Sequence, residues 1–262
     1  MFSKLLKYEL KSVGKWYFTL NASIIAISIF LGFSIKTLTD YAENYTTSNA
    51  NHYTQLIPII LSIMFGVVVA SAWIATLAII VRRFYKNIFG REGYLTLTLP
   101  VSTHQIILSK LIASLIWTAF NAIVVTIGVT LLVIPIFGLG HFLAFLPQFD
   151  KVLTLSEWGI GFLWLAISSI SGILLIYLAI TIGQLFANRR ALMAFVAYFV
   201  VSFIVLLVSE ILGSHELNSD LTIHFFIYSC IECFIEGAIF YLATHYFCLL
   251  YTSPSPRDYA AS

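Results

Sequence analysis

The stretch Arg82–Gln105, RRFYKNIFGREGYLTLTLPVSTHQ, is the one substantial polar passage between long apolar runs near the middle of the chain. It begins with the cations Arg82, Arg83 and Lys86, adds Arg91, and continues into the compact unit EGYLTLTLP. A passive connection between two membrane helices would be shorter and less defined than this. Because functional residues concentrate on connections held by a rigid scaffold, the sequence favours a folded working element here.

The composition predicts that most of the chain is surrounded by lipid. Hydrophobic residues make up 60% of the sequence and charged residues only 10%. A soluble domain of this length has too little interior to bury so many apolar side chains. The few basic residues lie beside apolar segments, which gives no support to nucleic-acid binding. The three cysteines all fall in the last apolar segment, so no extracellular disulfide framework is indicated.

Six apolar segments are long enough to cross the roughly 30 Å of membrane hydrocarbon. They run approximately over residues 16–36, 55–81, 105–137, 157–186, 191–212 and 223–247. The third exceeds the bilayer thickness and should tilt or project from it. We therefore expect an all-α polytopic membrane protein with six transmembrane helices, forming a single transmembrane domain over residues 1–247.

Residues 2–15 are expected to form a helix that lies in the membrane interface. At about 100° per residue, its cations share one face of the helix, with apolar side chains on the other: these cations are Lys4, Lys7, Lys11 and Lys15. Glu9 falls on the apolar side. Either this carboxylate reaches water, or it pairs with Arg82, Arg83 or Lys86.

Lysine and arginine alternate between the connections and set the expected orientation. They are present in the N-terminal segment, in the 82–105 loop and at Arg189 and Arg190. The other connections, residues 37–54, 138–156 and 213–222, contain only Lys151. Because cytoplasmic connections carry the excess of basic residues, both termini are expected to be cytoplasmic.

The polar loop has breaks at both of its ends. Gly90 is a common place for the preceding helix to stop. Residues 92–99 can form a short helix along the membrane surface, and Pro100 separates it from the next span. Ser102 followed by Gln105 matches a capping box at the start of the third span. A cytosolic partner could push on such a helix, and the push would pass into spans two and three.

Three blocks of sequence resemble the permease subunits of ABC type 2 exporters, in particular the six-span permeases of Gram-positive bacteria. They are KLLKYELK at residues 4–11, RFYKNIFGREGYLTLTLPVS at 83–102 and ILSKLIASLIW at 107–117. The resemblance implies an N-terminal elbow helix, six spans, and a coupling helix between spans two and three. It also implies a location in the bacterial plasma membrane.

In that family the coupling helix docks on a separate nucleotide-binding subunit, and two permeases, identical or related, combine with two ATPases. By position, the resemblance implies coupling residues Glu92, Gly93, Tyr94, Leu95 and Pro100. It implies elbow and interface residues Lys4, Lys7 and Glu9, with the loop cations Arg82, Arg83 and Lys86 beside them. ATP and magnesium would bind the partner subunit, and no cofactor is expected on this chain.

Motifs for catalysis are not found in the sequence. It has no GxxxxGK[ST] phosphate loop, no HExxH and no GxSxG. The chain is therefore expected to be a transport subunit rather than an enzyme. No metal site is expected either, because Cys230 and Cys233 have CxxC spacing within a lipid-embedded helix without a second ligand pair. The histidines show no ligand spacing.

Glu232 and Glu236 lie four residues apart in the sixth span and so share a helix face. An ionised carboxylate inside a membrane costs at least a few kcal/mol, so such residues usually face a cavity or a partner. Two interpretations stay open. The pair lines a translocation route, or it lies near the outer leaflet, partly hydrated or protonated.

The favoured function is the permease of an ATP-driven exporter. The alternative is a membrane immunity or sensor protein that binds a peptide or lipid and transports nothing. Residues 248–262, ending YTSPSPRDYAAS, resemble translated sequencing-adapter read-through. We expect this segment to be a non-native tail and expect the sixth helix to end near Phe247.

Overall fold

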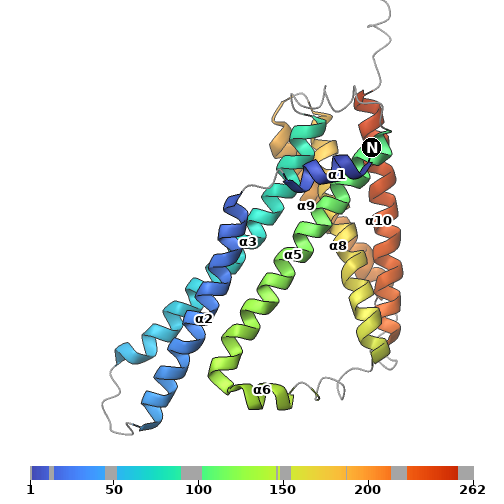
Figure 1. Cartoon of the computed structure of the whole chain (residues 1–262). Helices are drawn as coiled ribbons and strands as arrows, with labels where there is room; N and C mark the ends of the chain where they lie inside the picture. The colour runs from blue at the N-terminus through green and yellow to red at the C-terminus, as the bar shows by residue number, and fades with distance from the viewer. Residues whose placement is uncertain are drawn as a thin grey trace, which may run out of the picture. The chain divides into compact units, whose positions relative to one another are not determined.

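The computed structural model describes residues 2–11, 15–44, 52–89, 102–145, 147, 155–186, 188–213 and 223–252. Within these ranges the chain is almost entirely helical and contains no strand, which confirms the all-α expectation (Figure 1). Six of the described helices are long and apolar enough to cross a membrane. The chain is therefore a multi-pass helical membrane protein by architecture.

The helices follow the expected segments closely. Their bounds are α1 Phe2–Lys11, α2 Lys15–Asn44, α3 His52–Ile88, α5 Thr103–Phe137, α6 Leu139–Phe145, α8 Leu155–Gln184, α9 Arg190–Gly213 and α10 Ile223–Thr252. The six expected spans correspond to α2, α3, α5, α8, α9 and α10. The short helix α6 was not anticipated. The last helix, α10, continues past residue 247 to Thr252, into the segment expected to be a non-native tail, and buries Cys248.

Local sequence explains where α5 begins and ends. Ser102 caps its start, since the Ser102 hydroxyl oxygen accepts a hydrogen bond from the Gln105 backbone N–H at 3.4 Å. Gly138 ends it with a φ of 81°, a left-handed conformation that glycine adopts without a steric penalty. The 35 residues between correspond to about 52 Å of helix, which exceeds the hydrocarbon thickness, as expected.

The described helices form two compact units, and α3 and α5 each contribute to both. Unit 1 contains residues 2–10 of α1, the end of α3 from Ile80, the start of α5 to Leu115, and all of α8, α9 and α10. Unit 2 contains α2, α3 to Ile79, α5 from Ile116, and α6.

In unit 1, α8 packs along both α9 and α10 (Figure 1). Trp164 of α8 lies 5.9 Å from Phe226 of α10, measured between ring centroids. Further along both helices, a Cβ built on Gly237 would lie 3.8 Å from Ser171. The second contact involves higher residue numbers than the first on both helices, so α8 and α10 run parallel. This is expected of the fourth and sixth spans of a chain that crosses the membrane in alternating directions.

The end of α8 and the start of α9 lie against each other. A Cβ built on Gly183 would lie only 2.6 to 2.8 Å from Ala194 atoms, so the two helices approach closely at this end. Beyond this contact α9 presents large exposed apolar side chains, among them Phe195, Phe199 and Phe203. In a membrane helix such a surface is suited to lipid.

In unit 2, α2 and α5 also run parallel. The rings of Tyr17 and Trp117 are 5.4 Å apart and nearly perpendicular. A Cβ built on Gly128 would lie 2.9 Å from the Ser28 hydroxyl oxygen. One turn later, a Cβ on Gly32 would lie 2.8 Å from the Leu132 carbonyl oxygen. Small residues therefore bring the two backbones close together, which is how membrane helices associate without a hydrophobic driving force.

Candidate functional site

The residues expected to couple the chain to a partner lie outside the described part of the structure. These are Glu92, Gly93, Tyr94, Leu95 and Pro100. The structure does describe the two helix ends that flank them, the end of α3 and the start of α5. These ends show what the loop is attached to.

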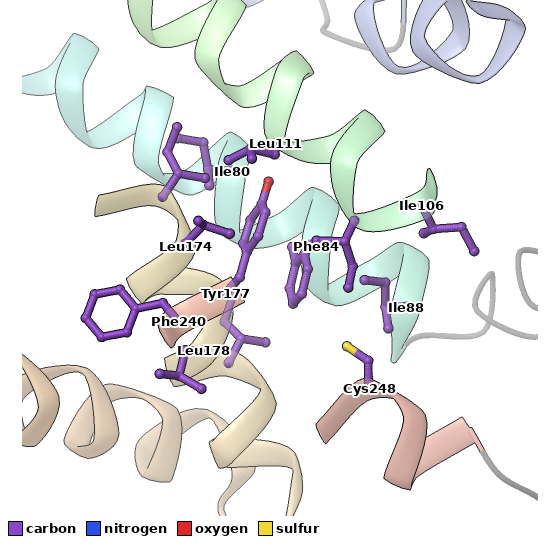
Figure 2. Packing of buried hydrophobic residues seen from close by; sticks show 13 residues of the cluster. Ile80, Phe84, Ile88, Ile106, Leu111, Leu174, Tyr177, Leu178, Phe240 and Cys248 are labelled. Carbon is purple, nitrogen blue, oxygen red and sulfur yellow. The ribbon is translucent and has the colours of Figure 1, made fainter. Parts of the chain in front are cut away.

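Both helix ends are buried in one apolar cluster of unit 1, which we call the base cluster. Side chains from α3, α5, α8 and α10 form it (Figure 2): Ile80, Phe84, Ile88, Ile106, Ile107, Leu111, Ile173, Leu174, Tyr177, Leu178, Ile180, Phe240 and Cys248. The end of α3, which precedes the loop, and the start of α5, which follows it, both contribute to this cluster. The loop therefore begins and ends on a single packed body.

A ring stack lies at the centre of the base cluster. The Phe84 and Tyr177 rings are 3.9 Å apart and inclined by only 9° (Figure 2). Both side chains are almost completely buried. The Tyr177 hydroxyl and the Ser114 hydroxyl are hydrogen-bonded at 2.9 Å. Through Tyr177, α8 thus contacts both the end of α3 and the start of α5.

A second contact joins the first turn of α5 to α10. A hydrogen bond of 2.8 Å connects His104 Nδ1 with the Tyr241 hydroxyl. The His104 ring also stacks on the His245 ring at 3.8 Å, with 15° between the ring planes. Sequence spacing could not reveal this group, because residues 104 and 245 lie in segments far apart in the chain.

The predicted interface cations are placed only in part. Arg82 and Lys86 lie on exposed positions near the end of α3, and Arg83 is half-buried. Lys7 is exposed on α1, which belongs to the same unit. The side chains of Lys4 and Glu9 lie outside those that the structure describes, so the predicted pairing of Glu9 stays a prediction.

The two carboxylates of α10 lie next to α8. The Ser171 side chain lies beside that of Glu236, and the Ser168 side chain lies beside Cys233 one turn earlier. Glu232 has a buried oxygen, Oε1, that no described group hydrogen-bonds. Both carboxylates are half-buried within the apolar length of α10. Among the residues that the structure describes, no three His, Cys, Asp or Glu side chains gather where they could hold a metal ion.

A group of polar residues in unit 2 was not anticipated. Asn21 on α2, Thr76 on α3 and Asn121 on α5 are each buried. Thr76 and the Tyr17 hydroxyl are hydrogen-bonded at 2.8 Å. A signal was present in the sequence, because Asn21 and Asn121 are amide side chains inside expected spans. Such residues commonly hydrogen-bond between membrane helices.

The fold and these contacts define a class, a multi-pass membrane protein with six candidate membrane-spanning helices, in which the helix ends on both sides of a polar loop are buried in one apolar cluster. Searches of protein-family models, curated proteins and solved structures found no match to this chain.

Proposed function

We propose that this chain is the permease subunit of an ATP-driven ABC exporter and that the loop at residues 90–101 is its docking element for the nucleotide-binding subunit. One observation carries the proposal. Both helices that flank the loop are buried in the base cluster, which also contains α8 and α10. A partner that moved the loop would therefore act on four helices at once.

The packing of the base cluster suits the transmission of movement. Close-packed interiors respond to force as connected bodies rather than as fluids. The stacked rings of Phe84 and Tyr177 join the end of α3 to α8. The Ser114–Tyr177 hydrogen bond and the His104 contacts attach α5 to the same body. Closure of an ATPase dimer would thus bias the helices between two arrangements.

Charge supports a cytoplasmic position for the loop. Arg82 and Lys86 lie near the end of α3, and both are exposed. Arg189, in the connection between α8 and α9, is exposed as well. In unit 1, the end of α8 lies in the same base cluster as the end of α3. The basic connections therefore lie at one end of that unit, as the positive-inside rule requires of a cytoplasmic end.

The carboxylates of α10 are the proposed polar lining of the transport route. Replacing Glu232 and Glu236 together by Gln keeps the shape of both side chains and removes their charge. We expect transport to change while the level of folded protein in the membrane does not. Unchanged transport would contradict the lining role and leave the coupling role untouched.

The coupling role is tested on the complex. The tagged chain is purified from its native membrane in a mild detergent, and ATP hydrolysis is measured in the eluate. We expect a nucleotide-binding subunit to co-purify. Tyr94→Ala and Glu92→Lys should abolish stimulation of ATP hydrolysis by substrate and leave membrane insertion intact.

Glu210→Lys is the charge-matched control. It makes the same reversal at an exposed position near the end of α9 and should retain wild-type hydrolysis. Recovery of the folded chain without any ATP-hydrolysing subunit would favour the immunity or sensor alternative. Wild-type stimulation in Tyr94→Ala and Glu92→Lys would remove the loop from the mechanism.

A further inference from the structure

Unit 2 contains a buried polar layer that the proposed function does not use. Its members are Tyr17 and Asn21 on α2, Thr76 on α3, and Trp117 and Asn121 on α5. Tyr17 opposes Trp117 through ring contact. Asn21 and Asn121 each follow one helical turn later on parallel helices. The two asparagines therefore lie at the same level of the α2–α5 contact.

Four polar atoms of this layer have no hydrogen-bond partner among the described residues. They are Asn21 Oδ1, Asn121 Oδ1, Asn121 Nδ2 and Trp117 Nε1. Asn121 is 0% exposed, Asn21 2% and Trp117 7%. Each buried polar group without a partner costs about 1–3 kcal/mol, and water inside a bilayer core is too scarce to offset this by chance. A layer with four such atoms calls for an occupant.

The chemistry of the four atoms selects the occupant. The two amide oxygens accept hydrogen bonds, while Asn121 Nδ2 and Trp117 Nε1 donate them. A metal cation could not accept from the two donors, and a deprotonated anion could not donate to the two oxygens. The occupant must be uncharged, and it must both donate and accept. The oxygen and nitrogen of Asn121 can be interchanged without altering this set of two donors and two acceptors, because neither atom has a partner.

A direct bond between the asparagines would not be sufficient. Even a reciprocal pair, in which each amide donates to the oxygen of the other, would leave Trp117 Nε1 without a partner. The Asn21 amide nitrogen has a second N–H for such a bond, because only one of its two hydrogens is used in the bond to the Tyr17 carbonyl oxygen at 2.9 Å. Water both donates and accepts, so one or more ordered water molecules can pair with the donors and the acceptors of the layer.

We propose that the polar layer is a binding site for ordered water between α2, α3 and α5. Water has a short route to it, because Asn21 lies only one turn, about 6 Å, beyond Tyr17, where the apolar length of α2 begins. The inference does not depend on the exporter proposal. It predicts that the α2–α5 contact is hydrated at this level and dry further along, where Ile24, Val124 and Ala72 pack together.

Radiolytic hydroxyl labelling of the full chain in lipid nanodiscs tests the site. Short X-ray pulses convert bound water into radicals that oxidise the nearest side chain, and a bulk scavenger suppresses labelling from solvent. We expect Trp117 to be oxidised several-fold faster than Trp164, which packs against Phe226 in unit 1, although Trp117 is almost fully buried. Trp117 labelling no faster than that of Trp164 would overturn the proposal.

Substitution provides the second arm of the experiment. Asn121→Leu removes two of the four polar atoms with little change in volume, and the labelling of Trp117 should fall to the level of Trp164. Asn21→Leu removes one of the four atoms and should lower the labelling of Trp117 by a smaller amount. Ile123→Leu, on an exposed position of the same helix, is the control and should change nothing. If the Asn121→Leu protein folds and Trp117 is labelled as fast as in the wild type, the proposed water site is contradicted. If that variant does not fold, the comparison of Trp117 with Trp164 in the wild type decides the proposal.

Discussion

The base cluster of unit 1 and the polar layer of unit 2 join helices in opposite ways. In the base cluster, apolar side chains pack around a ring stack, and the Tyr177 hydroxyl is paired with Ser114. In the polar layer, four amide and indole atoms have no hydrogen-bond partner among the described residues, and small residues bring α2 and α5 close only further along. The first arrangement is specific to one geometry. The polar layer can exchange its hydrogen bonds with water as helices shift. The base cluster is therefore suited to transmit movement, and the polar layer is suited to accommodate it.

The largest expected effect breaks the base cluster. Phe84→Ala removes a fully buried ring from its stack on Tyr177 and should destabilise the protein by about 3 kcal/mol. The thermal unfolding midpoint in mild detergent measures this change. Phe199→Ala removes the same side chain from an exposed face of α9 and should leave the midpoint almost unchanged. Equal effects of the two substitutions would show that Phe84 is not part of a packed base.

A smaller effect is expected where α8 turns into α9. Gly183→Ala places a methyl group within 2.8 Å of Ala194 backbone atoms, so the backbones must separate. We expect a loss of about 2 kcal/mol, read from the same unfolding measurement. The matched control is Gly172→Ala on the same helix, where no atom lies within 4 Å of the new methyl group. A Gly183→Ala protein as stable as the Gly172→Ala protein would rule out the close approach.

The α2–α5 contact should tolerate the same change better. Gly32→Ala brings a methyl group 2.8 Å from the Leu132 carbonyl oxygen, which is the one atom closer than 3.0 Å, whereas Gly183→Ala meets three Ala194 atoms that close. We expect a net loss of about 1 kcal/mol, against none for Gly66→Ala, which meets nothing within 4 Å. A loss larger than that of Gly183→Ala would reverse the comparison between the two units.

The smallest effects remove single hydroxyl groups. Tyr177→Phe keeps the ring stack and loses the bond to Ser114, and Tyr17→Phe loses the bond to Thr76. Hydrogen bonds between membrane helices contribute about 0.6 kcal/mol on average, so each substitution should lower stability by about that amount. Double-mutant cycles with Ser114→Ala and Thr76→Val measure each pair separately. Coupling energies near zero would show that the hydroxyl pairs do not stabilise either unit.

The sequence predicted the helices well and their contacts poorly. Long apolar runs and the cap at Ser102 determine helix bounds locally, so the six spans could be located from the sequence, although α2 and α3 continue seven to eight residues past the expected ends, to Asn44 and Ile88. The Phe84–Tyr177 stack and the His104–His245 pair depend on which helices are neighbours. In a membrane every span is apolar on all sides, so periodicity does not identify the packed face. Burial of Cys248 was missed for a different reason, because the end of the sequence was interpreted as a non-native tail.

The central claim is that the loop at residues 90–101 faces the cytoplasm on a rigid base, and side-specific labelling tests it most directly. Thr96→Cys is introduced after Cys230, Cys233 and Cys248 are replaced by serine or alanine, and a membrane-impermeant maleimide is applied to intact cells and to inverted vesicles. A cysteine at position 214 serves as the reference for the opposite side. The account predicts labelling of position 96 in inverted vesicles only. Labelling of position 96 in intact cells would contradict it.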